Sequence, residues 1–287
     1  MFNKLINTNA GGGGTTPDLS TANFVASRNL GDGGKGNIRN FFVTFDGTRV
    51  FTTHLDSSGN DWIQQHNLST PFDVTSVSGI VGSKQLTASI PNYLDALAVN
   101  LDNTWVTYDP YSINNYYSQP FGTAGEITTI GTLYTSSCSR TAPDTVSHSQ
   151  MVSKDGNYVL WITSALKYYK IPLSINNNLS SASGCGVSTS ISAITSDLGK
   201  YPQGFNFNFD GTKFYVFGGN GNSGTYDLST PWDVSTRSNL VTNDFSAALG
   251  NTDLVYHIQF NSDYSKLIIC TANDGYATRR IQEFDLG

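Results

Sequence analysis

The sequence is poor in charged side chains, which make up only 13% of its 287 residues, and it has no run of lysine or arginine. Its formal net charge is -6. Proteins that bind nucleic acid broadly, or that lie on anionic membranes, concentrate cationic side chains to neutralise phosphates. The composition therefore argues against both nucleic acid and membrane surfaces as partners.

Long apolar segments are also missing. No segment approaches the roughly 18 apolar residues that a membrane-spanning helix needs, and the first residues, Met-Phe-Asn-Lys-Leu-Ile, do not begin the apolar run of a signal peptide. We therefore expect synthesis in the cytoplasm, no membrane insertion and no Sec-type export. A place in a virion or an extracellular assembly would need another route, such as release of phage particles by lysis.

Residue types that build metal or catalytic centres are few and scattered. Cys138, Cys185 and Cys270 have neither the close spacing of metal ligands nor the even count of a disulfide framework, so we expect buried free thiols. The four histidines show no His-x-His or Glu-x-x-His spacing. No Gly-x-Ser-x-Gly elbow occurs, and the glycine runs lack the lysine and helix of a phosphate loop. The sequence thus predicts no metal, no cofactor and no nucleotide chemistry.

Aromatic, β-branched and small polar residues are plentiful instead, as in rigid β-proteins. The clearest unit spans residues 205 to 217, where two runs of aromatic and β-branched residues flank the turn Asp210-Gly211-Thr212. An Asp-Gly pair between two such runs is a strong signal for a β-hairpin. Helix should be scarce.

The same turn recurs along the chain with a nearly fixed period. Its aspartates, 53 to 56 residues apart, are Asp46, Asp102, Asp155, Asp210 and Asp263. The residues three before and four after each aspartate are apolar in every copy. Because strand side chains alternate between faces, each hairpin should present the same side to a packed neighbour. A period of this size with several strands is typical of a propeller blade.

The aspartates themselves are tempting as an acid cluster. Their identical place in the turn, however, gives each the same local task, which is to accept backbone N–H bonds in an Asx-type turn. We therefore interpret them as structural residues.

The two ends of the chain together supply the missing part of one period. There are 24 residues from Asp263 to Gly287 and 30 from Pro17 through Asp46. Asp-Leu-Ser-Thr at residues 18–21 also echoes the same letters at residues 227–230. The sequence therefore predicts an all-β fold over residues 17–287, a five-bladed β-propeller of four-stranded blades. Its ring is closed by the N-terminal strand joining the C-terminal blade, and the alternatives are a β-solenoid or a split into two domains.

Residues 1–16 end in Gly-Gly-Gly-Gly-Thr-Thr, which is typical of a flexible connection. We predict an N-terminal arm that attaches the propeller to other subunits of an assembly. The alternative is a disordered terminus without a partner.

Polar residues recur seven positions before each turn aspartate, where the innermost strands should begin. They are Arg39, Asp95, His148, Gln203 and Tyr256. At the start of inner strands they should surround one mouth of the central channel, a common ligand site in this architecture. Arg39, Asp95 and His148 come from consecutive blades and are the best candidates, while the alternative is that all five are solvated strand ends.

Three aromatic residues occupy matching positions after a proline. Phe72, Phe121 and Trp232 are candidates for stacking on sugar faces, as in lectins built blade by blade. The alternative is that they pack between outer strands.

Glycoside hydrolysis would require two carboxylates roughly 5 to 9.5 Å apart. The two glutamates, Glu126 and Glu283, are expected in outer-strand segments. The remaining candidates precede inner strands and are Asp95, Asp144, Asp197 and Asp253.

One stretch of the chain resembles a known kind of repeat. Phe-x-Phe-Asp-Gly-Thr-Lys-Phe-Tyr-Val at residues 207–216, followed by Tyr-Asp-Leu-Ser-Thr-Pro-Trp-Asp-Val-Ser-Thr at residues 226–236, is similar to propeller repeats of bacteriophage and bacterial surface proteins. The first unit also matches well, with Asn-Leu-Ser-Thr-Pro-Phe-Asp-Val at residues 67–74. The resemblance implies an association with phage or with a bacterial surface.

These observations favour a non-enzymatic structural or adhesion module of a virion or surface assembly. It would be a phage decoration, tail or receptor-binding component, with other subunits bound through residues 1–16 and a host-surface glycan or protein as ligand. The alternatives are a lectin-like, carbohydrate-binding propeller and, less favoured, a glycoside hydrolase.

Overall fold

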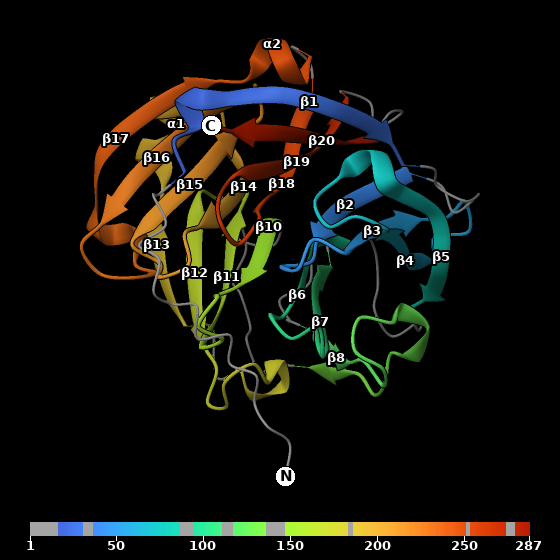
Figure 1. Cartoon of the computed structure of the whole chain (residues 1–287). Helices are drawn as coiled ribbons and strands as arrows, with labels where there is room; N and C mark the ends of the chain where they lie inside the picture. Colours follow the sequence, from blue (N-terminus) through green and yellow to red (C-terminus); the bar gives the residue numbers. More distant parts are fainter. Residues whose placement is uncertain are drawn as a thin grey trace.

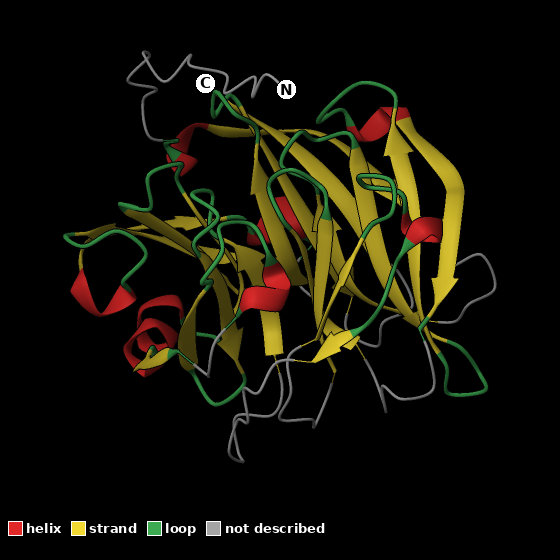
Figure 2. Ribbon diagram, turned by 90° about the horizontal axis from the view of Figure 1, so that it is seen from below, coloured by secondary structure: helices red, strands yellow, loops and turns green. Residues whose placement is uncertain are grey.

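Five antiparallel, four-stranded sheets stand around a common axis and form a five-bladed β-propeller (Figure 1). The computed structural model describes residues 17–30, 37–86, 94–110, 117–135, 147–182, 186–250, 253–273 and 279–287, without the side chains of a few residues at strand ends and bulges. Figure 2, turned by a quarter, shows the strands running through the thickness of the ring. The predicted fold class is confirmed.

Each blade is formed by consecutive strands from the axis outward, except that β1 is the outermost strand of blade five. Blade one contains β2 (Asn37–Val43), β3 (Arg49–Leu55), β4 (Asp61–Leu68) and β5 (Val77–Gln85). Blade two contains β6 (Leu94–Val99), β7 (Trp105–Pro110), β8 (Tyr117–Pro120) and β9 (Tyr134–Thr135). Blade three contains β10 (Ser147–Val152), β11 (Tyr158–Thr163), β12 (Lys167–Pro172) and β13 (Val187–Ser190). Blade four contains β14 (Pro202–Phe207), β15 (Lys213–Gly218), β16 (Asn222–Leu228) and β17 (Arg237–Asp244). Blade five contains β18 (Asp253–Phe260), β19 (Lys266–Asn273), β20 (Arg279–Leu286) and β1 (Ala22–Asn29).

Helical segments are short, as the composition indicated. The α-helices of the described residues are α1 (Ser192–Leu198) and α2 (Ser246–Leu249). A single 3-10 turn precedes each outermost strand, and these turns are η1 (Leu19–Thr21), η2 (Val74–Ser76), η3 (Ile127–Thr129), η4 (Leu179–Ser181) and η5 (Val234–Thr236). None of the helices in this part of the chain is long and apolar enough to cross a bilayer.

The ring is closed by the two ends of the chain, as predicted. β1 pairs antiparallel with β20 through seven residue pairs, from Ala22 opposite Leu286 to Asn29 opposite Arg280. The sequence echo that suggested this closure was, however, matched to the wrong position within blade four. Asp18 caps η1 by accepting the N–H of Ser20, so its equivalent is Asp233, which caps η5, rather than Asp227.

The turn aspartates have the structural role that their spacing indicated. In every blade the carboxylate accepts the backbone N–H two residues later, with N···O distances of 3.0 to 3.2 Å. The backbone N–H and the hydroxyl of Ser265 hold the pKa of Asp263 below its ordinary value. The residue after each aspartate is left-handed, with φ of 58° to 75°, which favours glycine or asparagine and makes Tyr264 the strained member of the set.

The apolar residues on either side of each turn pair directly across the hairpin. Val43 opposes Val50 in blade one, and Phe207 opposes Phe214 in blade four. All ten such residues are at most 1% exposed. They belong to apolar clusters that fill the spaces between adjacent blades, so the constant positions in the repeat are positions of contact between blades.

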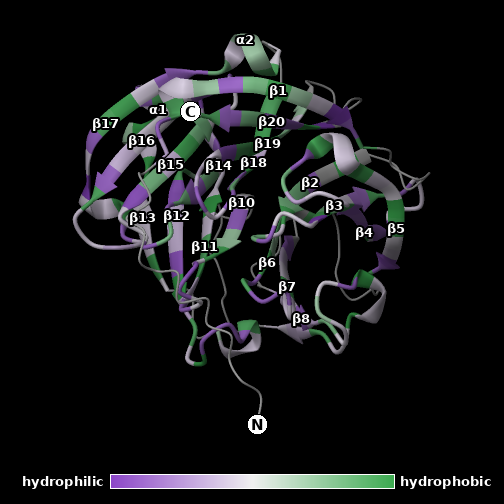
Figure 3. Cartoon of the chain, in the orientation of Figure 1, coloured by the Kyte–Doolittle hydropathy of each residue, from purple (hydrophilic) through white to green (hydrophobic). Residues whose placement is uncertain are grey.

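Hydrogen bonds from third strands hold the outer turns of the following blades. On β4, Gln65 Oε1 accepts the N–H of Ile127 at 2.9 Å, and on β20, Glu283 Oε2 accepts the N–H of Val74 at 3.0 Å. On β12, the Tyr168 hydroxyl donates to the Trp232 carbonyl at 2.9 Å. Neighbouring blades are therefore fixed by directional bonds as well as by apolar packing. The outer strand β17 is apolar in its middle, at Leu240 and Val241, and polar toward both ends (Figure 3).

The expectation of free thiols is confirmed for Cys270, which is buried on β19 and unpaired. Burial raises the pKa of its thiol. Cys138 and Cys185 lie outside the described residues, as do residues 1–16.

Truncating Phe207 should cost about 3 to 5 kcal/mol of unfolding free energy, because its ring lies 5.0 Å from that of Phe214 and 5.2 Å from that of Trp232. Val152→Ala removes less volume from the equivalent position in blade three and should cost less. Phe209→Ala is the matched control, because this ring is 63% exposed and its loss should change stability by no more than about 0.5 kcal/mol. Equal unfolding midpoints in denaturant for Phe207→Ala and Phe209→Ala would contradict the packing role.

Deleting residues 17–30 should be far more damaging than deleting residues 1–14. The first deletion removes β1 and leaves β20 as an unpaired edge, whereas the second leaves every described strand intact. Thermal unfolding of both truncated chains checks this. A chain that begins at residue 31 and keeps the melting temperature of the full chain would show that β1 does not seal the ring.

Candidate functional site

Every inner strand contains a one-residue irregularity at the same place. In β2, Ile38 opposes His54 and Asn40 opposes Thr53, so Arg39 is an extra residue on its strand. The corresponding extra residues of β6, β10, β14 and β18 are Asp95, His148, Gln203 and Tyr256. These are the five predicted mouth residues. The structure therefore gives them equivalent positions, one per blade, at the beginning of each innermost strand, whereas the aspartate turns follow the end of these strands.

A β-bulge of this kind bends its strand and re-aims a side chain. Of the five side chains, those of Gln203 and Tyr256 are described, and both are half-buried. Gln203 Oε1 is buried without a hydrogen-bond partner among the described residues, whereas the ring of Tyr256 packs against the apolar cluster between blades five and one. The side chains of Arg39, Asp95 and His148 lie outside the described set, so their convergence stays a prediction.

The residue that follows each bulge is buried, and in three blades it is polar. Asn40, Ser149 and His257 are each 1% exposed. Ser149 Oγ and His257 Nε2 have no hydrogen-bond partner among the described residues. The sequence did not single out this buried polar layer. Its signal would have been the polar residue directly after each mouth candidate in blades one, three and five.

His257 is the most strongly perturbed titratable group of this layer. Its ring lies 4.8 Å from that of Phe42, which belongs to blade one, and it is fully enclosed. Burial lowers the pKa of His257 to about 3. The imidazole is therefore neutral at physiological pH and contributes no positive charge to the mouth.

Phe72 and Trp232, two of the candidates for sugar stacking, cover the hairpin turns. A Cβ atom on Gly47 would lie 2.1 Å from the Phe72 ring, and one on Gly211 would lie 2.3 Å from the Trp232 ring. Phe72 is only 6% exposed and Trp232 only 3%. The rings pack inside the protein and leave no face for a sugar, which supports the packing interpretation.

Phe121 was matched to the wrong position, although it is also buried at 7% exposure. Its N–H donates to the Thr104 carbonyl, as that of Leu68 donates to Thr48 in blade one. The equivalent of Phe72 in blade two is Gly125. Its N–H donates to the carbonyl of Asn103, the residue after the turn aspartate, as the N–H of Phe72 donates to the carbonyl of Gly47. The shared proline therefore does not mark a shared structural position.

The described carboxylates proposed for hydrolysis have structural partners. Glu283 lies on β20, the third strand rather than an outer strand, and binds Lys266 with one oxygen and the Val74 N–H with the other. Glu126 precedes η3 and lies 3.5 Å from the Arg49 guanidinium.

Asp197, on α1, accepts the hydroxyl of Tyr226 at 2.7 Å. The side chains of Asp95, Asp144 and Asp253 lie outside the described residues. Within the described ranges, no three His, Cys, Asp or Glu side chains are grouped as metal ligands.

A buried cation lies near the aspartate turns. Lys154 is 7% exposed, has no carboxylate partner among the described residues, and places Nζ 5.4 Å from the centre of the Tyr264 ring. Burial lowers the pKa of Lys154 to about 8. This contact joins blades three and five. The sequence gave no sign of it, because the equivalent residue is apolar in most blades.

No family model matches the chain, and no curated protein matches it. Among solved structures, a periplasmic gluconolactonase of Pseudomonas aeruginosa is 15% identical with a TM-score of 0.49, and covers 82% of this chain and 66% of its own. A putative 6-phosphogluconolactonase from Bacteroides uniformis is 16% identical with a TM-score of 0.50, over 81% of this chain and 63% of its own. The β-propeller domain of Cps50 (Swd1) from Myceliophteria thermophila is 7% identical with a TM-score of 0.44, and the match covers 86% of this chain and 68% of that domain's chain. The likeness shows the fold alone.

The buried His257 should make the protein less stable in mild acid. The unfolded chain, with an ordinary histidine pKa of about 6.5, binds the proton before the folded chain, whose pKa is about 3. The free energy of unfolding should therefore be highest above pH 6.5 and fall by about 1.4 kcal/mol per pH unit below it. The free energy of unfolding can be measured with urea at pH 7 and at pH 5. The decrease from pH 7 to pH 5 should be about 2 kcal/mol smaller for His257→Met than for the natural chain. Equal losses would contradict a neutral, buried imidazole.

Proposed function

We propose that the chain is a rigid, non-enzymatic recognition module of a virion or surface assembly, and that the five bulged residues at the axis contact its ligand. Residues 1–16 attach the propeller to another subunit. The sequence resemblance to phage and bacterial surface repeats supports the setting, and the bulges support the site.

This proposal rests on a contrast between two kinds of position in the repeat. The structural positions of the repeat keep one chemistry in all five blades: an aspartate in the turn, a left-handed residue after it, and an apolar pair across the hairpin. The bulge position keeps its backbone geometry and changes its chemistry in every blade. A position that served only to fold the blade would be as uniform as the others.

The residue types at this position suit a polar ligand. Arg39 and His148 supply donors, Asp95 supplies an acceptor, and Gln203 supplies both. Such a mixed set fits the hydroxyl and amide groups of a host-surface glycan or the loops of a surface protein. A net charge of -6 for the whole chain also favours a neutral or cationic ligand over a polyanion.

The experiment is a binding screen on glycan arrays and intact host cells with single variants Arg39→Ala, Asp95→Ala and His148→Ala. Each should weaken binding by about tenfold or more, since each removes a hydrogen-bonding group from the contact. Phe209→Ala is the control, because it changes an exposed side chain near an aspartate turn, at the other end of the inner strands.

A chain without residues 1–16 separates recognition from attachment. It should bind the same ligand but fail to join its assembly. Full binding by all three mouth variants would overturn the ligand site. Hydrolysis of glycosides or lactones by the natural chain, lost in Asp95→Asn, would show an enzyme instead.

A further inference from the structure

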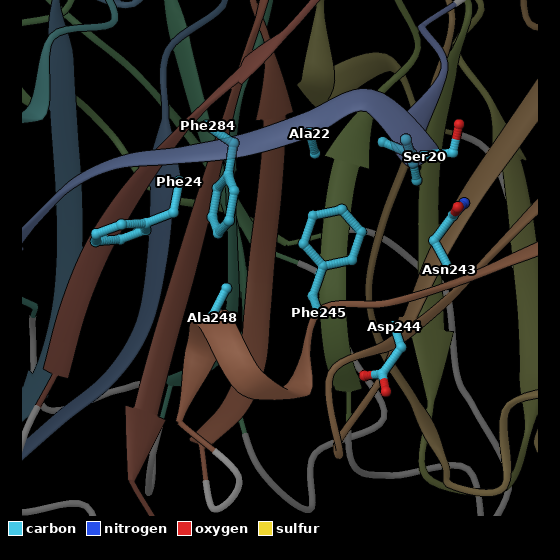
Figure 4. A pocket seen from close by; sticks show the side chains of 9 residues that line it. Ser20, Ala22, Phe24, Asn243, Asp244, Phe245, Ala248 and Phe284 are labelled. Carbon is cyan, nitrogen blue, oxygen red and sulfur yellow. The ribbon is translucent and has the colours of Figure 1, made fainter.

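A pocket of about 290 Å³ lies at the seam of the ring, between the outer parts of blades four and five (Figure 4). It is bordered by the end of β17, by α2 and by β1. Its walls contain Ser20, Phe24, Asn243, Asp244, Phe245 and Phe284. Since β1 comes from the N-terminal segment, the pocket forms only when the ring is closed.

One wall of the pocket is aromatic and rigid. The ring of Phe284 lies edge-on to its neighbours, 5.7 Å from Phe24 and 5.4 Å from Phe245. Phe284 and Phe245 are 1% and 5% exposed, so packing holds both rings in place. Phe24 is 49% exposed and offers its ring to a ligand.

The opposite side of the pocket is polar, and Figure 4 shows the side chains of Asn243 and Ser20 there. The Asn243 side chain is half-buried. Asp244 Oδ1 accepts the N–H of Ser246 at 2.7 Å, which fixes the carboxylate at the start of α2. Hydrogen bonds from the hydroxyl and the N–H of Ser246 hold the pKa of Asp244 below its ordinary value, so the carboxylate is ionised at neutral pH.

We propose that this seam pocket binds one pyranose ring of a neutral sugar, stacked on Phe24 and hydrogen-bonded through its hydroxyls to Asn243 and Asp244. A sugar has an apolar face and a polar edge, and it matches a pocket with one aromatic and one polar wall. The volume is close to the lower end of ligand pockets, roughly 300 to 1,000 Å³, which suits one ring rather than an oligosaccharide.

Two other ligand chemistries fit less well. None of the described residues that line the pocket is a lysine or an arginine, so an anionic sugar would meet the Asp244 carboxylate without a neighbouring cation from this part of the chain. A quaternary ammonium ion would need several ring faces around it, whereas among the described residues of the pocket Phe24 is the one aromatic side chain that is about half exposed. The pocket is separate from the bulged residues at the axis, so this inference does not depend on the proposed function.

Saturation-transfer NMR with a panel of methyl glycosides of glucose, galactose, mannose and N-acetylglucosamine tests the proposal on the full chain. Choline and glucose 6-phosphate serve as cationic and anionic probes. At least one neutral glycoside should bind, and Phe24→Ala should weaken it by about fivefold or more. Asp244→Asn keeps an oxygen for the Ser246 N–H and removes the charge, and it should also weaken binding.

Phe209→Ala is the matched control, since it removes another exposed phenylalanine, 63% exposed against 49% for Phe24, from another part of the surface, and should bind as the natural chain does. Thermal melts of each variant verify folding, which Phe24→Ala should retain because the ring is half exposed. The proposal is overturned if no neutral glycoside binds, if choline or glucose 6-phosphate binds in their place, or if Phe24→Ala and Phe209→Ala bind equally. Loss of binding in the axis variants alone would likewise place the sugar elsewhere.

Discussion

Antiparallel pairing between the first and the last strands of the chain holds the remaining parts of this propeller in register. β1 covers the outer edge of β20, and β20 carries Glu283, whose carboxylate holds the N–H of Val74 in blade one. Leu19 and Leu286 complete the apolar cluster between blades four and five. Closure thus covers a sheet edge and completes part of a core, beside the strand that also bonds to blade one. An open ring would leave the outer edge of β20 unpaired and would remove Leu19 from the core, which makes the fold cooperative around one seam.

Within the closed ring, some positions of each blade maintain the fold and others are free to vary. The aspartate turn and the apolar pair beside it repeat with little variation because backbone geometry and inter-blade volume allow few solutions. The bulge lies seven residues before the turn aspartate. Its backbone geometry is the same in all five blades, but its residue type differs, and the five residues are Arg39, Asp95, His148, Gln203 and Tyr256. Varied side chains on an invariant backbone are how propellers, like other repeat proteins, gain different binding surfaces without altering their core.

The architecture could be predicted from the sequence because the same pattern occurs five times, whereas a single copy would have been ambiguous. Five copies of one hairpin defined the blade, its inner strand and its packing face, and the lengths of the two ends defined closure. The predictions were wrong where similar short sequences occupy different structural positions in the blade. Phe121 follows a proline as Phe72 does, yet the hydrogen bonds of the backbone place Gly125 at the Phe72 position. Asp18 was likewise matched to Asp227, although its cap is that of Asp233.

Side-chain environments were harder to predict than strand order. Phe24, Asn243 and Asp244 come from two outer strands that are distant in sequence, and only the closed ring brings them to one pocket. Lys154 occupies a place where most blades have apolar residues, and its Nζ lies over the ring of Tyr264, which belongs to a blade that is not adjacent in the chain. Such contacts depend on the three-dimensional ring and leave no periodic signal.

The direction in which β1 pairs has a mechanical consequence. The first pair of the seam, Ala22 with Leu286, lies next to both ends of the described chain, and Gly287 lies beside Thr21. A force that separates these two ends would open the seven pairs one after another, so a small load would peel β1 away. A pull on the N-terminal end along the strand axis, with the ring held at its blades, would load all seven pairs in shear at the same time. The seam therefore resists tension strongly in one direction and weakly in the other.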